Sequence, residues 1–321
     1  MPRKRLRLGL LGTGVAARQL YLPAFRRLRH RIELVACASR RRAKALAYAR
    51  EAGIPDVESC AEALFERQDL DAVLISLPID RQPEYVLAAL AAGKAVLSEK
   101  PIAPSVAAGK RLLAAARRHR RPWLVGENFA FMPHVHRLEQ WLRTGRLGAL
   151  RLVQVAQITL MDRNNPYFGT GWRREPKHVG GFVVDGGVHV AEVVRRCFGM
   201  PTRVKALTAA FDPALPPLDT AVAALKFPSG VLGTWTSCYS APCTGPMLRV
   251  FGSHASVELD WGGVTLHEKG RSKRYPTERD SFEAQFDHFA DVVLDERPLK
   301  YTPEEALDAL ALVQRIVEAR G

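Results

Sequence analysis

The stretch that decides the fold is LRLGLLGTGVAA, residues 6–17. Its apolar first half predicts a β-strand, and the residues after the second glycine predict the start of a helix. Between them stands the pattern G-x-G-x-x-A. Gly12 permits a tight turn, Gly14 lets a pyrophosphate approach the backbone, and Ala17 replaces the third glycine where the helix meets the strand. The stretch therefore predicts a dinucleotide-binding loop at a helix N-terminus, whose free N–H groups attract phosphate.

The first 125 residues continue this alternation of short apolar runs and helical stretches. Such an alternation predicts a doubly wound parallel sheet with helices on both faces. The strands are expected at Leu6–Leu11, Ile32–Ala38, Ala72–Ser76, Ala95–Ser98 and Trp123–Val125. The helices are expected at Ala16–Leu28, Arg42–Ala52, Pro83–Ala92 and Ser105–His119.

After about residue 126, long stretches alternate polar and apolar residues, which is typical of an antiparallel sheet. The strands are expected at Leu150–Leu160, Val204–Phe211, Ala221–Phe227, Val231–Tyr239, Leu248–Phe251, Ser256–Leu259 and Val264–His267. Helices are expected at His134–Thr144, Val188–Phe198 and Pro303–Ala319. We therefore predict an α/β protein with a Rossmann domain, residues 1–125, and an α+β domain with a large, mostly antiparallel, open-faced sheet, residues 126–321. The final helix, 303–319, is a candidate to pack back on the first domain.

Composition argues against several classes of protein. No apolar run approaches the roughly 18–20 residues that cross a bilayer, so we expect no membrane partner. The five cysteines are odd in number and form no CxxC pair, which argues against a disulfide framework and favours the cytoplasm. His134, His136 and His178 match no metal-ligand spacing, so no metal site is expected. The net charge of +14 comes without a nucleic-acid-binding motif, so we expect a solvated basic surface and no nucleic-acid partner.

The end of the second predicted strand indicates which cofactor binds. An NAD site usually places Asp or Glu there to hold the ribose 2′-hydroxyl. Here the strand is followed by Ser39, Arg40 and Arg41, without an acidic residue. A hydroxyl and guanidinium groups suit a 2′-phosphate, so we predict NADP(H) in preference to NAD(H). The alternative is that these arginines simply face water at the start of a helix.

Two further elements carry chemistry. Lys100 follows a predicted strand of the parallel sheet, at the edge where ligands bind in this architecture, and its ammonium can hydrogen-bond a substrate oxygen. Asp185 and His189 have the i, i+4 spacing that places both side chains on one face of a helix. A carboxylate beside an imidazole suits proton transfer to or from an alcohol. The alternatives are a solvated lysine and a structural histidine.

Together these elements resemble the Gfo/Idh/MocA oxidoreductases, the family of glucose–fructose oxidoreductase and inositol dehydrogenase. The resemblance covers nearly the whole chain. It rests on the glycine pattern, AALAAGKAVLSEKP at 88–101, Gly126-Glu-Asn at 126–128, Trp172-Arg173, GGFVVDGGVH at 180–189 and TPEEAL at 302–307.

The resemblance implies hydride transfer between a nicotinamide cofactor and a hydroxyl- or carbonyl-bearing carbon of a sugar or cyclitol. Lys100 would bind the reacting oxygen, His189 would be the general acid/base, and Asp185 would bind a neighbouring hydroxyl or orient the imidazole. Trp172 and Arg173 would lie along the substrate site. The implied cofactor contacts are Gly12, Thr13, Gly14, Val15, Ala16, Ser39, Arg40, Arg41, Leu77, Pro78, Gln82, Glu99, Lys100 and Asn128. A homodimer or homotetramer through the outer face of the second sheet is also implied.

The sequence departs from the family pattern at several positions, which favours a substrate unlike the best-known sugars. Leu77-Pro78-Ile79 with Gln82 replaces Thr-Pro-Asn followed by His, Ala130 replaces an Arg, Phe182 replaces a third glycine, and Glu192 stands where Asp is frequent. Three other functions are weighed against the oxidoreductase. They are a non-catalytic dinucleotide-binding sensor, an enzyme that uses a tightly held cofactor for a net non-redox step, and a nucleic-acid-binding protein.

Overall fold

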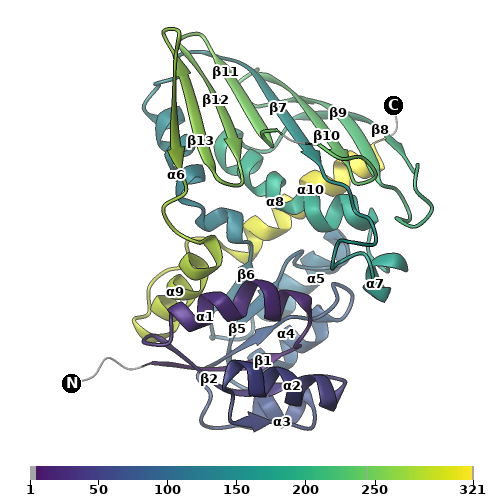
Figure 1. Ribbon diagram of the computed structural model, residues 1–321, viewed down its shortest axis with the longest axis vertical. Coiled ribbons are helices and arrows are strands. Elements are labelled where there is room, and N and C mark those ends of the chain that lie inside the picture. Colours follow the sequence, from purple (N-terminus) through teal and green to yellow (C-terminus); the bar gives the residue numbers. More distant parts are fainter. Residues whose placement is uncertain (1–4, 244, 320–321) are drawn as a thin grey trace. The chain divides into compact units, whose positions relative to one another are not determined.

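The computed structural model describes residues 5–243 and 245–319, which form two compact units (Figure 1). The first unit contains the chain up to Asn128 together with Asp280–Leu307. The second contains Phe129–Arg279 together with the chain from Asp308 onward. A late segment of the chain is therefore part of the same compact unit as the N-terminal sheet.

The first unit is built on a six-stranded sheet in the order β3-β2-β1-β4-β5-β6, and every pair of neighbouring strands is parallel. This is the doubly wound order, in which ligands bind beyond the carboxyl ends of the strands where the strand order reverses, here between β1 and β4. The expectation of a Rossmann-type sheet is confirmed. The strands are β1 (Leu6–Leu11), β2 (Ile32–Ala38), β3 (Asp56–Val57), β4 (Ala72–Ile75), β5 (Ala95–Glu99) and β6 (Trp123–Gly126).

The inner strands of this sheet are buried on both faces, because their residues are apolar without alternation. All four residues of the inner strand β4 are buried, and so are those of the edge strand β6. The helices of this unit are α1 (Leu22–Arg27), α2 (Arg42–Ala52), α3 (Ala61–Glu66), α4 (Gln82–Ala91), α5 (Val106–Ala116) and α9 (Ser281–Leu294). The short β3 and α3 lie between expected elements and had no sequence prediction.

The helix after the first strand differs from the single helix expected at Ala16–Leu28. A π-helical turn, Ala17–Tyr21, precedes α1. Pro23 sits in the first turn of α1 and has no N–H to give to the carbonyl four residues earlier, which accounts for the wider turn at this point.

Helix α9 completes the first unit by packing aromatic rings against the first helix. The Phe25 and Phe286 rings stack with centroids 4.5 Å apart, and Tyr21 meets Phe286 edge-on at 5.4 Å. At the end of this contact Arg31, 8% exposed at its side chain, donates to the Asp291 carboxylate at 2.6 Å. No helix was predicted from the sequence at this place.

The second unit is built on an eight-stranded sheet in the order β14-β13-β12-β11-β7-β10-β9-β8. All neighbours are antiparallel except β7 and β10, so the expectation of a mostly antiparallel sheet is confirmed. The strands are β7 (Leu150–Ile158), β8 (Arg203–Ala209), β9 (Thr220–Lys226), β10 (Leu232–Cys238), β11 (Leu248–Gly252), β12 (Ala255–Asp260), β13 (Gly263–Glu268) and β14 (Arg271–Pro276). The edge strand β14 was not predicted, because it is highly charged and has no apolar alternation.

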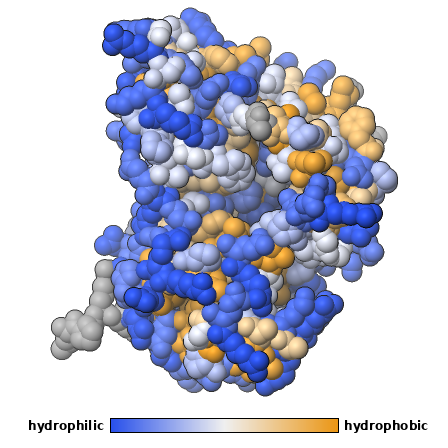
Figure 2. All heavy atoms as spheres, in the orientation of Figure 1, coloured by the Kyte–Doolittle hydropathy of each residue, from blue (hydrophilic) through white to orange (hydrophobic). Residues whose placement is uncertain are grey.

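One face of this sheet is covered by helices and the other is open. Burial alternates along β9 and β10, as a half-covered sheet requires. The helices of this unit are α6 (Pro133–Arg143), α7 (Gly171–Arg174), α8 (Gly181–Phe198) and, from Asp308 onward, α10 (Pro303–Glu318). On the open face Leu207, Val222 and Leu232 are 73%, 48% and 58% exposed. Hydrophobic surface is visible over β8 and β9 in Figure 2.

Helix α8 begins at Gly181, seven residues before the expected Val188–Phe198 helix. Gly180 and Gly181 make the turn into it with φ of 71° and 52°. A Cβ on Gly181 would lie 2.3 Å from the Pro216 carbonyl oxygen, so only glycine fits there. Gly186 and Gly187 are poor helix formers, but here they admit Tyr239 and Val313 close to the helix backbone.

Candidate functional site

The turn after β1 has a shape that only glycine can take at its first position. Gly12 has φ of 101°, and a Cβ there would lie 2.1 Å from the Ser76 carbonyl oxygen at the end of β4. The Gly12 N–H donates to the Ala38 carbonyl at the end of β2, at 2.8 Å. The turn is therefore held against both strands that flank β1.

The rest of this turn fits a dinucleotide phosphate. Gly14 is exposed, and a Cβ there would meet nothing within 4 Å, so a ligand can come close to its backbone. The Thr13 side chain is buried, and its Oγ1 has no hydrogen-bond partner among the described residues. Ala17 is fully buried, and its carbonyl accepts from the Tyr48 hydroxyl at 3.2 Å. Val15 and Ala16 are half-buried at the start of the helix, where N–H groups are free for phosphate.

The residues after β2 present positive charge at the same edge of the sheet. Ser39 is half-buried, whereas Arg40 and Arg41 are exposed. Neither guanidinium has an ion pair or hydrogen bond within residues 5–243 and 245–319. Arg42, in contrast, donates to the Val57 carbonyl at 3.4 Å. Arg40 and Arg41 are therefore two unpaired cations just after β2, where a Rossmann domain binds the adenosine ribose.

The segments after β4 and β5 meet at Pro101. Gln82, 1% exposed at the start of α4, points its amide nitrogen at the Pro101 carbonyl at 3.5 Å, and its Oε1 has no partner among the described residues. Leu77 and Pro78 lead into this helix and are half-buried. The Lys100–Pro101 peptide is cis, and the Lys100 N–H donates to the Glu99 carboxylate at 3.1 Å. Lys100 itself is half-buried at the carboxyl end of β5.

Asn128 was expected to contact the cofactor. Its side chain is buried, and its amide nitrogen donates to the Ser281 hydroxyl at 2.8 Å. The residue therefore ties the end of β6 to the first residue of α9. This contact was not predicted, and contact of Asn128 with the cofactor stays a prediction.

In the second unit, Asp185 is joined to Arg173. Both Asp185 and His189 belong to α8, where four residues bring side chains to the same face. The Arg173 Nε donates to the Asp185 Oδ2 at 2.7 Å, and these side chains are 14% and 8% exposed. The Arg173 guanidinium lies 3.9 Å from the Trp172 ring centroid and 4.8 Å from that of Tyr167. It also donates to the Thr170 hydroxyl at 3.3 Å, so α7 is anchored to α8 through one side chain.

His189 stacks on an aromatic ring that the sequence did not single out. The imidazole and the Phe129 ring are nearly parallel at 21°, with centroids 4.8 Å apart. Trp261, 61% exposed, meets the same Phe129 ring edge-on at 5.0 Å. Phe129 directly follows the Gly126–Asn128 motif, and that position is the only sequence signal that could have identified it.

Two buried polar groups beside Asp185 were also missed. The Tyr239 hydroxyl is buried against Gly186 and has no hydrogen-bond partner among the described residues. Burial, and then the Asp185 charge, hold the pKa of Tyr239 well above its usual range. The Gln157 amide donates to the Gly186 carbonyl at 2.9 Å, and its Oε1 is buried without a partner. These groups fix the middle turn of α8 from the sheet side.

Other kinds of site find little support in the described part of the chain. Residues 5–243 and 245–319 contain no group of three or more His, Cys, Asp or Glu side chains that could hold a metal ion. Among the described helices, none has the length and apolar character needed to cross a membrane. All five cysteines lie in the described part and are free thiols.

Comparisons with known proteins find dehydrogenases and oxidoreductases along nearly the whole chain. The chain is similar to a protein named as a dehydrogenase from Fusarium mangiferae, 30% identical over 97% of this chain and 95% of that one. It is also similar to the structure of an oxidoreductase from Thermotoga maritima, with a TM-score of 0.93 and 31% identity over 98% of this chain and 97% of that one. An aldose–aldose oxidoreductase from Caulobacter crescentus, solved with glycerol, gives a TM-score of 0.86 and 25% identity over 98% and 97%.

Two family models match consecutive parts of the chain. Residues 6–127 match the NAD-binding Rossmann fold of an oxidoreductase family, and residues 140–320 match its C-terminal alpha/beta domain. Both models describe the family that the motifs resemble, and together they cover most of the sequence. The chain belongs to the Gfo/Idh/MocA oxidoreductase family and carries that family's NAD-binding Rossmann domain.

Proposed function

We propose that this protein transfers a hydride between a nicotinamide dinucleotide and a carbon bearing a hydroxyl or carbonyl, on a sugar, cyclitol or related polyhydroxylated compound. The observation that carries the proposal is the turn at Gly12, which excludes every side chain and leaves the backbone at Gly14 open to a phosphate. A sugar-like substrate is supported by the similarity to an aldose–aldose oxidoreductase.

In the proposed reaction, one side chain binds the reacting oxygen and another transfers the proton. Bound nicotinamide supplies or accepts the hydride. The Lys100 ammonium hydrogen-bonds the reacting oxygen and stabilises the negative charge that develops there during reduction. A ring nitrogen of His189 gives a proton to that oxygen in reduction and takes one in oxidation. Arg173 holds the Asp185 carboxylate in a fixed place on the same helix face as His189.

The second part of the proposal is a preference for NADP(H). Arg40 and Arg41 are exposed and unpaired in the described part of the chain, and no carboxylate follows β2 to bind a 2′-hydroxyl. A 2′-phosphate would give these guanidinium groups the charge-assisted hydrogen bonds that the protein itself does not supply.

We also propose a homo-oligomer that covers the open face of the second sheet. Leu207 and Val222 are direct cross-strand neighbours, and Leu232 lies on the next strand, so three exposed apolar side chains share one face. Exposed apolar residues grouped in this way are typical of an interface. Sedimentation of Leu207→Lys beside the wild type tests this part, and an unchanged sedimentation coefficient contradicts it.

The experiment that tests the function is a calorimetric titration of cofactor-free protein with NADPH and with NADH, followed by turnover with a panel of keto-sugars and polyols. We expect NADPH to bind at least about tenfold more tightly, which is about 1.4 kcal/mol. His189→Asn should keep cofactor binding and lose turnover, and Lys100→Met should also lose turnover. Failure to bind either dinucleotide overturns the proposal, and equal binding overturns only the NADP preference.

A further inference from the structure

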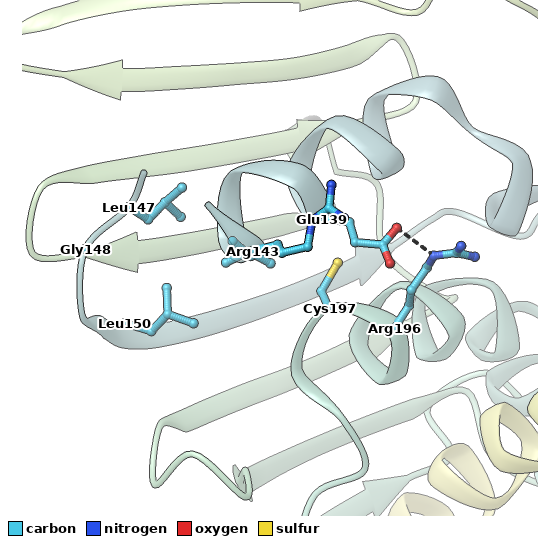
Figure 3. Close-up of a pocket in the computed structure, with 8 residues that line it drawn as sticks. Glu139, Arg143, Leu147, Gly148, Leu150, Arg196 and Cys197 are labelled. Carbon is cyan, nitrogen blue, oxygen red and sulfur yellow. Dashed lines mark hydrogen bonds and ion pairs between the residues drawn. The ribbon is translucent and has the colours of Figure 1, made fainter. Parts of the chain in front are cut away.

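A pocket of about 380 Å³ opens in the second unit at the C-terminal end of α8, where its lining residue Arg196 lies two helical turns beyond His189. It lies between α6, the turn that leads into β7, and the C-terminal end of α8 (Figure 3). Leu147 and Leu150 form one side, and Cys197 with the Glu139–Arg196 ion pair forms the other. The volume is within the range of sites that hold small molecules.

The lining combines an apolar wall with one available cation. Leu142, Leu147 and Leu150 contribute hydrocarbon surface, and burial holds the pKa of the Cys197 thiol well above its usual range, so this group is uncharged. Arg143 is exposed, and its guanidinium has no ion pair or hydrogen bond in the part of the chain that the structure describes. Such a lining suits a ligand with a short apolar chain and one anionic head.

The opposite wall is connected to the stacking partner of His189. The Arg196 guanidinium pairs with Glu139 at 3.0 Å and with Glu192 at 3.7 Å, and it points at the Ala130 carbonyl at 3.5 Å. Ala130 is covalently next to Phe129, whose ring stacks on the His189 imidazole. A second anion near Arg196 would compete with Glu139 for this guanidinium, and a shift of Arg196 would break its contact with the Ala130 carbonyl, next to Phe129.

We propose that this pocket is a regulatory site for a small amphipathic carboxylate. Its occupancy changes how the Phe129 ring stacks on the His189 imidazole, through Arg196 and Ala130. Arg143 binds the carboxylate, and the leucines hold the chain. The binding step is independent of the proposed oxidoreductase function, whereas an effect on catalysis rests on it. Such an effect requires the ligand to bind more tightly when the Arg196 guanidinium has left Glu139 than when this ion pair is intact.

Octanoate is the probe that tests binding, in calorimetric titrations of the full chain. A ligand of this size in such a pocket is expected to have a Kd of about 0.1–1 mM. Arg143→Gln should weaken it at least about tenfold, and Arg143→Lys should recover part of the affinity. Leu150→Trp should block the pocket. Octan-1-ol, which lacks the charge, should bind more weakly by a similar factor.

The matched control is Arg111→Gln, because Arg111 is an exposed arginine of the other unit and is likewise unpaired among the described residues. It should bind octanoate as the wild type does. Circular dichroism of each variant shows that it is folded. Absence of saturable binding below about 10 mM, or equal affinity of Arg143→Gln and Arg111→Gln, overturns the site.

The coupling is tested by the proton NMR signal of the His189 ring, assigned by its loss in His189→Asn. Octanoate should shift this signal in the wild type. Phe129→Leu should still bind octanoate but lose the shift, because the stacked ring is gone. Binding without any shift in the wild type overturns the coupling. Neither readout uses turnover, so a failure here is distinct from a failure of the oxidoreductase proposal.

Discussion

The ion pair between Arg173 and Asp185 gives a stability prediction that can be worked from its geometry. Arg173→Met removes the guanidinium but keeps an unbranched apolar stem beside Trp172. The two charged atoms are 2.7 Å apart, and the carboxylate side chain is 8% exposed. At an effective dielectric constant of about 20 this separation corresponds to a gross attraction of about 6 kcal/mol. Desolvation cancels much of that, and removing one partner of a buried pair costs about 3–5 kcal/mol.

We therefore expect Arg173→Met to lower the free energy of unfolding by about 3 kcal/mol, at the lower end because Arg173 is the more exposed partner. Asp185→Asn should cost less, since its amide oxygen can still accept from the guanidinium. The double variant should be more stable than the sum of the two losses predicts, by about 2 kcal/mol. Urea unfolding at pH 7, followed by circular dichroism, measures all four proteins.

Two results would refute this reasoning. One is an Arg173→Met protein within about 0.5 kcal/mol of the wild type, which is the range of an ordinary surface substitution. The other is strict additivity in the double variant, which would show that the two side chains do not interact in solution. Arg173→Lys is the matched control, because it keeps the charge but lacks the planar fork, and we expect it to fall between the wild type and Arg173→Met.

Three further predictions concern other parts of the chain. Gly12→Ala should lower the melting temperature and abolish dinucleotide binding, because its Cβ would lie 2.1 Å from the Ser76 carbonyl oxygen. Gly14→Ala should leave the melting temperature unchanged, because its Cβ would meet nothing within 4 Å. Equal melting temperatures of the two variants would contradict this prediction. Burial lowers the pKa of His288 to about 4, from 6.5. The free energy of unfolding should therefore be up to about 3 kcal/mol larger above pH 6.5 than near pH 4, and this difference is lost as the pH falls between the two values. His288→Gln should flatten that slope in urea titrations from pH 7 to pH 4, and an unchanged slope would exclude it. Replacing Arg40 and Arg41 with Ser should weaken NADPH at least about tenfold and leave NADH within about twofold in calorimetry; equal losses would show general electrostatic attraction instead.

Local pattern was enough to predict most of the first sheet. The strands from Leu6–Leu11 to Trp123–Val125 were found within a residue or two, because each is a short apolar run between turn residues. The turn at Gly12 could also be predicted, since its reason is steric. The register that brings Ser76 against Gly12 could not, because it depends on strands more than 60 residues apart in the sequence.

The first turns of α8 and the whole of α9 were not predicted, for different reasons. Helix α8 contains two consecutive glycines, and only the Tyr239 and Val313 side chains packed on them explain why a helix forms there. Helix α9 did carry a signal that was overlooked. Phe282, Phe286 and Phe289 recur at helical spacing after Asp280, whose carboxylate accepts from the Glu283 N–H at 2.9 Å and caps the first turn.

The candidate site was only partly accessible from the sequence. Lys100, Asp185 and His189 are polar residues in recognisable motifs. Phe129 and Tyr239 are aromatic residues of an ordinary core pattern, and their relation to His189 and Asp185 arises from packing across 60 and 54 positions of the chain. Sequence spacing carries no information about such contacts. A reactive group can therefore be identified from its motif, whereas the residues packed around it are identified only from the structure.

The assignment of α9 to the first unit sets an order on how the protein can fold during synthesis. Tyr21 and Phe25 emerge from the ribosome early, but the ring that covers both, Phe286, is synthesised more than 250 residues later. Until then the nascent nucleotide-binding unit exposes aromatic surface, which is a binding site for chaperones and a risk of aggregation. The second unit, nearly all of which lies between Phe129 and Arg279, can collapse first. The N-terminal unit therefore cannot finish folding until α9 has been made, and the second unit likewise waits for the chain after Asp308, which brings Val313 onto α8.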